Sequence, residues 1–206
     1  MNRLAVSVVI FLSVSGMMGM ASALPQIQIT TGKPVYHYGE SLSLSITVSN
    51  VTGDMAVLQI TDQSNQSSSP INLMISKPVS SITAPVPFYR TTFAPGSYLV
   101  QIQYDGASAS TAFKLVDSGE VAIPPQFKTV ASSWVHNQTS GRLFGEHIAE
   151  LVSSGVITVN DFQEQNQVVI PEWFKNDANW WSNGDISDND FGHVVEYLIE
   201  SKIMKV

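Results

Sequence analysis

Hydrophobic and polar residues alternate along residues 26–116, so the pattern there has a period of two. The clearest runs cover residues 42–48, 98–104 and 111–115. Alternation of this kind is typical of strands that bury one face. Weaker candidate strands, separated by turn-forming Gly, Pro, Asn and Asp, lie at residues 26–31, 55–61, 71–76 and 88–93. Seven short strands of this kind predict an all-β, immunoglobulin-like sandwich over residues 24–117.

At one position in this segment the sequence predicts a specific hydrogen-bonded motif. Such sandwiches carry a tyrosine whose hydroxyl bonds back to the chain a few residues upstream, two residues before the second cysteine of an antibody domain. Gly96 and Tyr98 match that pattern, and Val100 stands where the cysteine would be. We therefore expect a tyrosine corner at Tyr98.

After a short linker at residues 118–122 the period changes to 3.6, and the new pattern occurs twice. Residues 170–206 align without a gap on residues 123–159, 47 positions earlier, and 12 of the 37 pairs are identical. Each copy predicts two short helices, and residues 160–169 link the copies. A helix pair of this size cannot bury its apolar face alone. The copies should therefore pack on each other or on the preceding domain.

The second copy carries clear helix boundaries. Pro171 suits the first turn of a helix, and Asn183 with Gly184 favours its end. Ser187 followed by Asp190 predicts a capping box at the start of the next helix. The apolar positions that follow run as far as Ile203. The first copy keeps the apolar positions, but it has Gly141, Arg142 and Leu143 where the second has Asp188, Asn189 and Asp190. The shared positions are expected to form the core and the differing ones the surface.

The first 23 residues predict a secretory signal peptide. Arg3 precedes an apolar run at residues 4–20, and Ala21-Ser22-Ala23 is typical of a cleavage site. An uncleaved N-terminal anchor is the alternative, and no later stretch is expected to span a membrane. Without Arg3 the chain carries nine basic and 17 acidic residues, which argues against nucleic acid as a partner. Cysteine is absent, which excludes disulfides and thiolate metal sites.

Three Asn-x-Ser/Thr sequons, at Asn50, Asn65 and Asn137, are glycosylation candidates. Together with the signal peptide they favour a secreted protein associated with the cell surface. Whether a glycan is attached depends on the host.

All four tryptophans lie in the repeated copies. Trp134, Trp173 and Trp181 fall on the apolar stripe and are expected in the core. Trp180 lies off that stripe, and Ser133 occupies its position in the first copy, so Trp180 is the best candidate for an exposed contact. We assign Trp180, Asp185 and Asp188 as candidate partner-binding residues.

Catalytic, cofactor and metal sites are not expected. Asp185, Asp188 and Asp190 offer oxygen ligands for calcium, but their spacing is not that of an EF-hand and helix capping explains two of them. His147 and Glu150 share a helix face, yet a site needs three or four convergent ligands. The sequence contains no nucleophile elbow, P-loop, dinucleotide fingerprint or His-Glu-x-x-His motif. The chain is accordingly interpreted as a non-enzyme.

Two segments resemble known families. The run Gly32-Lys-Pro-Val-Tyr-His-Tyr-Gly-Glu40 resembles the opening strands of macroglobulin-type β-sandwich domains, and residues 96–113 are similar to their closing strands. The run Ile-Pro-x-Trp-Phe-Lys-Asn-x-Ala-x-Trp-Trp-Ser-x-Gly-x-Ile-Ser-Asp-x-Asp-Phe at residues 170–191 resembles a helical module of exported proteins of ammonia-oxidising archaea. The first copy departs from that run at Gln126 and Ser133. The resemblance implies an exported, archaeal cell-envelope protein and assigns no activity.

We therefore expect a non-catalytic interaction or structural protein of the cell envelope that binds a protein partner through the helical modules. Two alternatives stay open. One is a module that binds carbohydrate or an envelope polymer through exposed aromatic residues. The other is an extracytoplasmic accessory subunit of a membrane-bound complex. The expected partner is thus a protein or glycan of the envelope.

Overall fold

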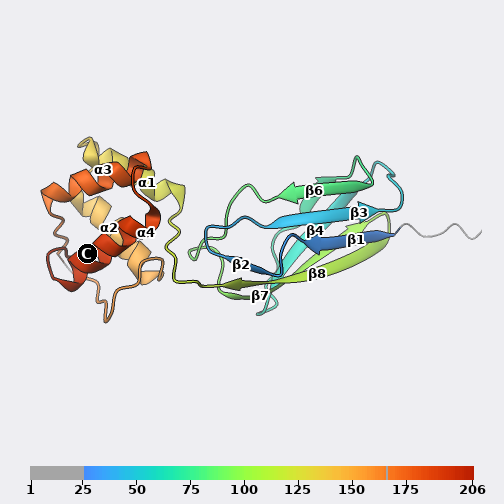
Figure 1. Ribbon diagram of the computed structural model, residues 1–206, viewed down its shortest axis with the longest axis horizontal. Coiled ribbons are helices and arrows are strands. Elements are labelled where there is room, and N and C mark those ends of the chain that lie inside the picture. The colour runs from blue at the N-terminus through green and yellow to red at the C-terminus, as the bar shows by residue number, and fades with distance from the viewer. Residues whose placement is uncertain (1–25, 166) are drawn as a thin grey trace, which may run out of the picture.

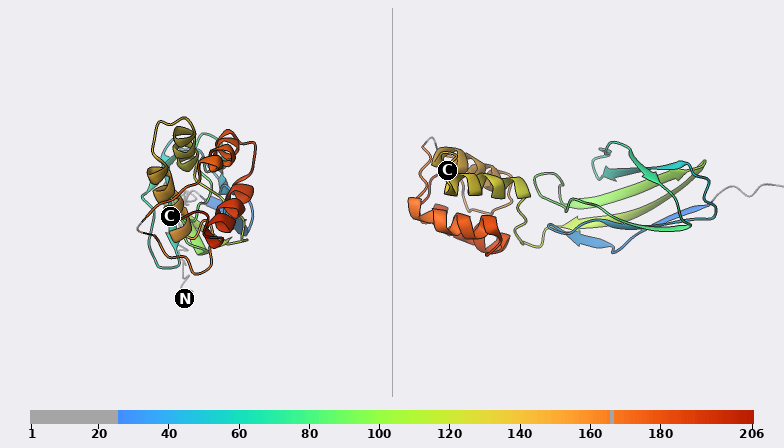
Figure 2. Two further views of the ribbon diagram at one scale, coloured as in Figure 1. Left: turned by 90° about the vertical axis from the view of Figure 1, so that its left-hand side faces the viewer. Right: turned by 90° about the horizontal axis from the view of Figure 1, so that it is seen from above.

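The computed structural model describes residues 26–165 and 167–206. The predicted signal peptide lies outside the described residues. Figures 1 and 2 show an elongated molecule with a β domain at one end and a helical domain at the other. In the described chain the β-strands come first and four α-helices follow them.

The β domain forms two sheets. Strands β1, β3 and β6 form one sheet in that order, and β2, β8, β7, β4 and β5 form the other. Neighbouring strands are antiparallel, except that β2 runs parallel to β8. The strands are β1 Ile27–Thr31, β2 Val35–His37, β3 Ser43–Val48, β4 Met55–Asp62, β5 Ile71–Met74, β6 Val79–Thr83, β7 Gly96–Tyr104 and β8 Ala107–Val116.

Side chains from both sheets form one hydrophobic cluster, because alternate residues of strands such as β1, β3 and β7 are buried. In β7 the residues Tyr98, Val100, Ile102 and Tyr104 are buried while those between them are exposed. The sequence alternation thus correctly identified the buried face.

The tyrosine corner is present. The Tyr98 hydroxyl donates to the Ala94 carbonyl oxygen at 2.7 Å, and the Tyr98 ring stacks on Phe113 with a centroid distance of 5.1 Å. Val100 is fully buried. An apolar contact therefore fills the position that a cysteine occupies in antibody domains.

The expected strand at residues 88–93 does not form. Turns occupy this segment, and Phe88 instead joins an aromatic cluster with Tyr36 and Phe113 at centroid distances of 5.6 and 5.3 Å. Its amide donates to the Glu40 carbonyl oxygen at 2.8 Å. This apolar segment is therefore buried by the packing of a loop and not as a strand of a β-sheet.

Two strands have little pattern in the sequence. β2 is three residues long. β6 is an edge strand whose residues are all exposed or half-buried. A short or edge strand does not need the clean alternation that reveals a strand packed on a core.

The helical domain contains the two predicted helix pairs. The first copy forms α1 Pro125–Val135 and α2 Gly141–Ser153. The second forms a 3₁₀ turn, η1 Glu172–Phe174, followed by α3 Lys175–Asn183 and α4 Asp188–Glu200.

Two of the predicted helix boundaries in the second copy are confirmed, and two differ. Ser187 and Asp190 make both hydrogen bonds of the capping box, and Gly184 ends α3 in the left-handed conformation at φ 85°. Pro171 precedes η1 as its cap and does not lie within its first turn. Ile203 was expected on the buried face, but α4 ends at Glu200; Ile203 is exposed and Met204 is buried in its place.

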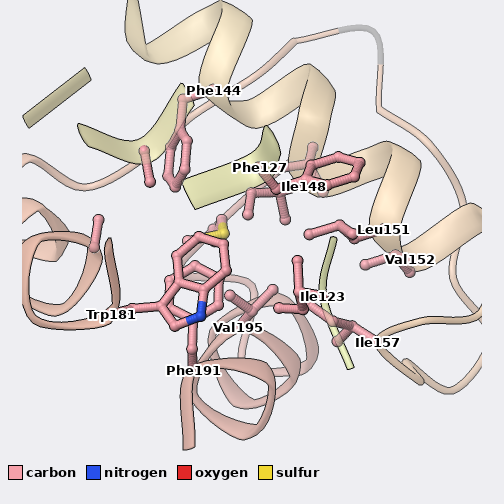
Figure 3. Close-up of a cluster of buried hydrophobic side chains, with 14 of the residues drawn as sticks. Ile123, Phe127, Phe144, Ile148, Leu151, Val152, Ile157, Trp181, Phe191 and Val195 are labelled. Atoms are coloured by element: carbon pink, nitrogen blue, oxygen red, sulfur yellow. The ribbon is translucent and has the colours of Figure 1, made fainter. Parts of the chain in front are cut away.

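The two copies pack on each other and share one core (Figure 3). α1 and α3 pack together, and the equivalent residues Ala131 and Ala178 are both fully buried. Small side chains at these positions allow two helices to approach closely. The core draws on all four α-helices, as the labelled residues Phe127, Phe144, Trp181 and Phe191 show.

The segment that leads into each copy packs on the second helix of the other copy. Val121 lies against Gly192 of α4, and Val168 lies against Gly145 of α2. Val121 and Val168 are 47 positions apart, so the repeat begins two residues earlier than the alignment of residues 123–159 indicated. In this crossed packing each leading segment contacts the other copy, which explains why both Gly145 and Gly192 are glycine.

Gly145→Ala is expected to destabilise the helical domain, although alanine favours helices. A Cβ atom on Gly145 would lie 2.2 Å from Val168 Cγ1 and 3.2 Å from Ile170 Cδ1. Overpacking of this kind costs about 1–3 kcal/mol, which exceeds the gain of about 1 kcal/mol in helix propensity. The measurement is the free energy of unfolding in urea. Val168→Ala in the same chain should restore part of the lost stability. A Gly145→Ala variant as stable as the parent would contradict the close contact between Gly145 and Val168.

Candidate functional site

The Asp188 carboxylate joins three parts of the helical domain. Its Oδ1 accepts from the Trp181 indole Nε1–H at 2.8 Å and lies 3.1 Å from Lys128 Nζ; its Oδ2 accepts from the Ile123 amide at 2.8 Å. The neighbouring Asn189 Oδ1 accepts from the Val121 amide at 2.6 Å. The start of α4 therefore holds the segment that enters the first copy. Partner binding by Asp188 stays a prediction, since its observed contacts are internal.

Each copy also places a lysine over the buried tryptophan of the other copy. Lys128 Nζ lies 5.5 Å from the Trp181 ring centroid, and Lys175 Nζ lies 5.5 Å from that of Trp134. A carboxylate holds each lysine: Asp188 holds Lys128, and Glu172 holds Lys175 at 2.9 Å. A lysine that contacts both an indole ring and a carboxylate is thus a repeated element of this domain.

The two copies differ beside these tryptophans. In the first copy Gly141 stands at the position of Asp188, and a Cβ atom there would lie 3.3 Å from Trp134 Nε1. The first copy therefore has no carboxylate for its indole N–H at this position. Both rings still stack on a phenylalanine: Trp134 on Phe144 at 4.4 Å and Trp181 on Phe191 at 3.9 Å.

Of the three tryptophans expected in the core, two are buried. Trp134 and Trp181 are 2% and 0% exposed, but Trp173 is 54% exposed, so its assignment to the core was wrong. Trp173 lies in η1, where three residues per turn change the angular position of each side chain, and Phe174 takes the buried place. Trp180 is 49% exposed, which confirms that it lies on the surface.

Trp173 in η1 and Trp180 in α3 are both exposed. Seven positions separate them in the chain, and Asp177 lies between them in the sequence. Asp177 and Trp180 are three residues apart within α3 and are therefore neighbours on the helix surface. Asp185 follows, and its amide donates to the Trp180 carbonyl oxygen at 2.8 Å. We call the residues Trp173, Asp177, Trp180 and Asp185 the Trp173–Trp180 face.

This face belongs to the second copy alone. The equivalent positions in the first copy hold uncharged residues: Gln126, Val130, Ser133 and Gln138. Within residues 26–165 and 167–206, neither Asp177 nor Asp185 forms an ion pair. The fold therefore accepts Gln and Ser at the positions where the second copy exposes two indoles.

A second feature is a cleft of about 310 Å³ between the two domains, lined in part by Tyr38, Arg90, Asp117 and His193. Arg90 pairs with Asp117 at its edge. Burial raises the pKa of Tyr38, with Arg90 acting in the opposite direction, and the Tyr38 hydroxyl donates to the Phe93 carbonyl oxygen at 2.9 Å. Tyr38, Arg90 and Asp117 thus make their contacts within the protein, and His193 of α4 lines the same cleft.

The other candidate residues are dispersed. His147 Nδ1 lies 3.3 Å from Glu150 Oε2, but no group of three metal-ligating side chains forms in the described part of the chain. Asn50, Asn65 and Asn137 are exposed, and Asn137 Oδ1 accepts from Lys175 Nζ at 2.7 Å. Within the described ranges, none of the helices has the length and apolar character that a membrane crossing requires.

The chain matches no protein-family model and no curated protein. It is similar to several solved structures. The sulfur carrier protein SoxY from Chlorobium limicola is 13% identical with a TM-score of 0.27, over 47% of this chain and 86% of that one. The PKD domain of an M14-like peptidase from a Thermoplasmatales archaeon is 10% identical with a TM-score of 0.27, over 44% and 94%.

The Ig7 domain of Dscam1 is 14% identical with a TM-score of 0.27, over 45% of this chain and 98% of that domain. The chain therefore has immunoglobulin-like structural neighbours. TM-scores of this size carry no argument about function.

Asp188→Ala is expected to destabilise the helical domain by about 1–3 kcal/mol, because it leaves the Trp181 and Ile123 N–H groups without an acceptor. The matched control is Asp185→Ala, since Asp185 is exposed and should change stability by less than about 0.5 kcal/mol. The measurement is the free energy of unfolding of both variants in urea. Equal stabilities would show that the contacts of Asp188 contribute little.

The capping box predicts a dependence of stability on pH. Hydrogen bonds from the Ser187 hydroxyl and then its amide lower the pKa of the exposed Asp190 carboxylate from its ordinary value of 3.8. A lowered pKa stabilises the fold at pH values above 3.8, and this contribution is lost as the pH falls through the lowered value. The difference in unfolding free energy between the parent and Ser187→Ala should therefore narrow on acidification. A difference that stays constant with pH would contradict this.

Proposed function

We propose that this chain is an exported, non-catalytic interaction protein of the cell envelope that binds a protein partner through its helical domain. In this proposal an immunoglobulin-like sandwich acts as a spacer, and the helical domain presents the Trp173–Trp180 face. The pattern of residues 1–23 and the resemblance of residues 170–191 to a module of exported archaeal proteins support the location.

The observation that carries the proposal is the exposure of two tryptophans within the short segment formed by η1 and α3. Trp173 and Trp180 leave large apolar areas in water, whereas the other two tryptophans of the domain are buried. Exposed apolar surface forgoes about 25 cal/mol for each Å². Tryptophan is enriched among the residues that dominate protein–protein binding energy. A face of this composition is therefore suited to a partner.

Two alternatives use the same face. Exposed indoles also stack on sugar rings, so an envelope polymer is a second candidate ligand. An accessory subunit of a membrane-bound complex differs only in the identity of the protein partner. The experiment below separates protein from polysaccharide directly.

The test is cross-linking of the mature protein in its native cell envelope, followed by mass spectrometry. The parent chain should capture one protein in stoichiometric yield, cross-linked through residues 170–206. The double variant Trp173→Gln/Trp180→Ser should capture at least about tenfold less, since hot-spot residues each contribute about 2 kcal/mol or more. The first copy already carries Gln and Ser at the equivalent positions, so the variant should keep its fold.

The matched control is Gln126→Ala/Ser133→Ala on the first copy, which should leave capture unchanged. Thermal unfolding of both variants checks that each remains folded. Recovery of polysaccharide alone would favour the second candidate ligand. Capture that both variants leave intact would contradict the assignment of the face.

A further inference from the structure

Charge is distributed unequally between the two domains. Residues 26–116 contain four basic and four acidic residues, whereas residues 117–206 contain five basic and 13 acidic residues. The excess negative charge thus lies in the helical domain. Charge of one sign on a binding surface attracts and orients a partner of the opposite sign.

The two lysines that lie over the buried tryptophans are already paired with carboxylates. Lys175 pairs with Glu172, and Lys128 pairs with Asp188. Asp177 and Asp185, which flank Trp180, have no ion pair in the described ranges. The negative charge of the Trp173–Trp180 face is therefore not neutralised from within the described chain.

The buried tryptophans show what such a face can hold. Trp181 has Lys128 over its ring and Asp188 beside that lysine; Trp134 has Lys175, with Glu172 beside it. In each case one lysine contacts both an indole ring and a carboxylate. Trp180 has the indole and two carboxylates close by in the chain, but within residues 26–165 and 167–206 no lysine or arginine lies over it or over Trp173.

We propose that the partner presents a cationic segment, with lysine or arginine side chains that occupy the Trp173–Trp180 face. This inference rests on the proposed function, because it describes the partner of the same face. The attraction combines the ring quadrupole of each indole with the carboxylates of Asp177 and Asp185. The same arrangement disfavours an acidic partner, because like charges would meet at the face.

The first experiment uses the mature chain and a synthetic peptide with two lysines in a Gly/Ser background. The peptide with glutamine at both positions is its control. NMR detects the indole N–H signals of the four tryptophans. The lysine peptide should shift the Trp173 and Trp180 signals and leave those of Trp134 and Trp181 in place. Binding should weaken with added salt, because Asp185 is exposed and Asp177 is only partly buried.

The matched protein variants are Asp177→Asn/Asp185→Asn and Asp161→Asn/Glu164→Gln. Both remove two negative charges from the helical domain, but only the first removes them from the Trp173–Trp180 face. The first variant should bind the lysine peptide about three- to tenfold more weakly, and the second should bind it like the parent. Equal effects of the two variants would mean that overall charge and not the face attracts the peptide, and would overturn the inference.

The same variants in the envelope cross-linking experiment separate this inference from the proposed function. If Trp173→Gln/Trp180→Ser abolishes capture while Asp177→Asn/Asp185→Asn does not, the face binds a partner that is not cationic, and only this inference fails. If neither variant affects capture, both fail. Shifts of the two indole signals by a neutral oligosaccharide, with none from the lysine peptide, would also overturn the inference and favour a glycan ligand.

Discussion

The helical domain depends on mutual burial between its two copies. Neither helix pair encloses an apolar core by itself, and the close contact of α1 with α3 at Ala131 and Ala178 brings the two half-cores together. The leading segments then cross to the opposite copy, where Gly145 and Gly192 leave room for Val168 and Val121. The duplication therefore builds one domain and not two, and the surface of each copy is positioned by the other.

The sequence predicted the elements with strong periodicity and missed those without it. The alternation in β7, the tyrosine corner at Tyr98 and the cap at Ser187 were all visible, since each depends on residues close together in the chain. The edge strand β6 and the packed loop at residues 88–93 were not, because tertiary contacts decide them. Trp173 was misplaced for a local reason: η1 is a 3₁₀ turn, which shifts the residue away from the stripe that an α-helix would form.

The comparison of the two copies indicated core and surface, but only in part. Shared residues such as Phe127 and Phe174 are indeed buried. Asp188 and Asn189, which the first copy lacks, were expected on the surface, yet they bind the backbone at residues 121–123. A difference between repeats can therefore mark an asymmetric structural contact. The exposed residues Trp173 and Trp180 illustrate a second kind of difference between the copies. At these positions the fold tolerates tryptophan in one copy and glutamine or serine in the other.

The attachment of residues 121–123 to α4 has a mechanical consequence. The chain leaves β8 at Val116, and within a few residues it is bound to the C-terminal copy before it enters the N-terminal one. Tension applied between the β domain and the chain end therefore acts on both copies at once. Unfolding of either copy breaks its contacts with the other, so under force the helical domain should yield in a single cooperative step.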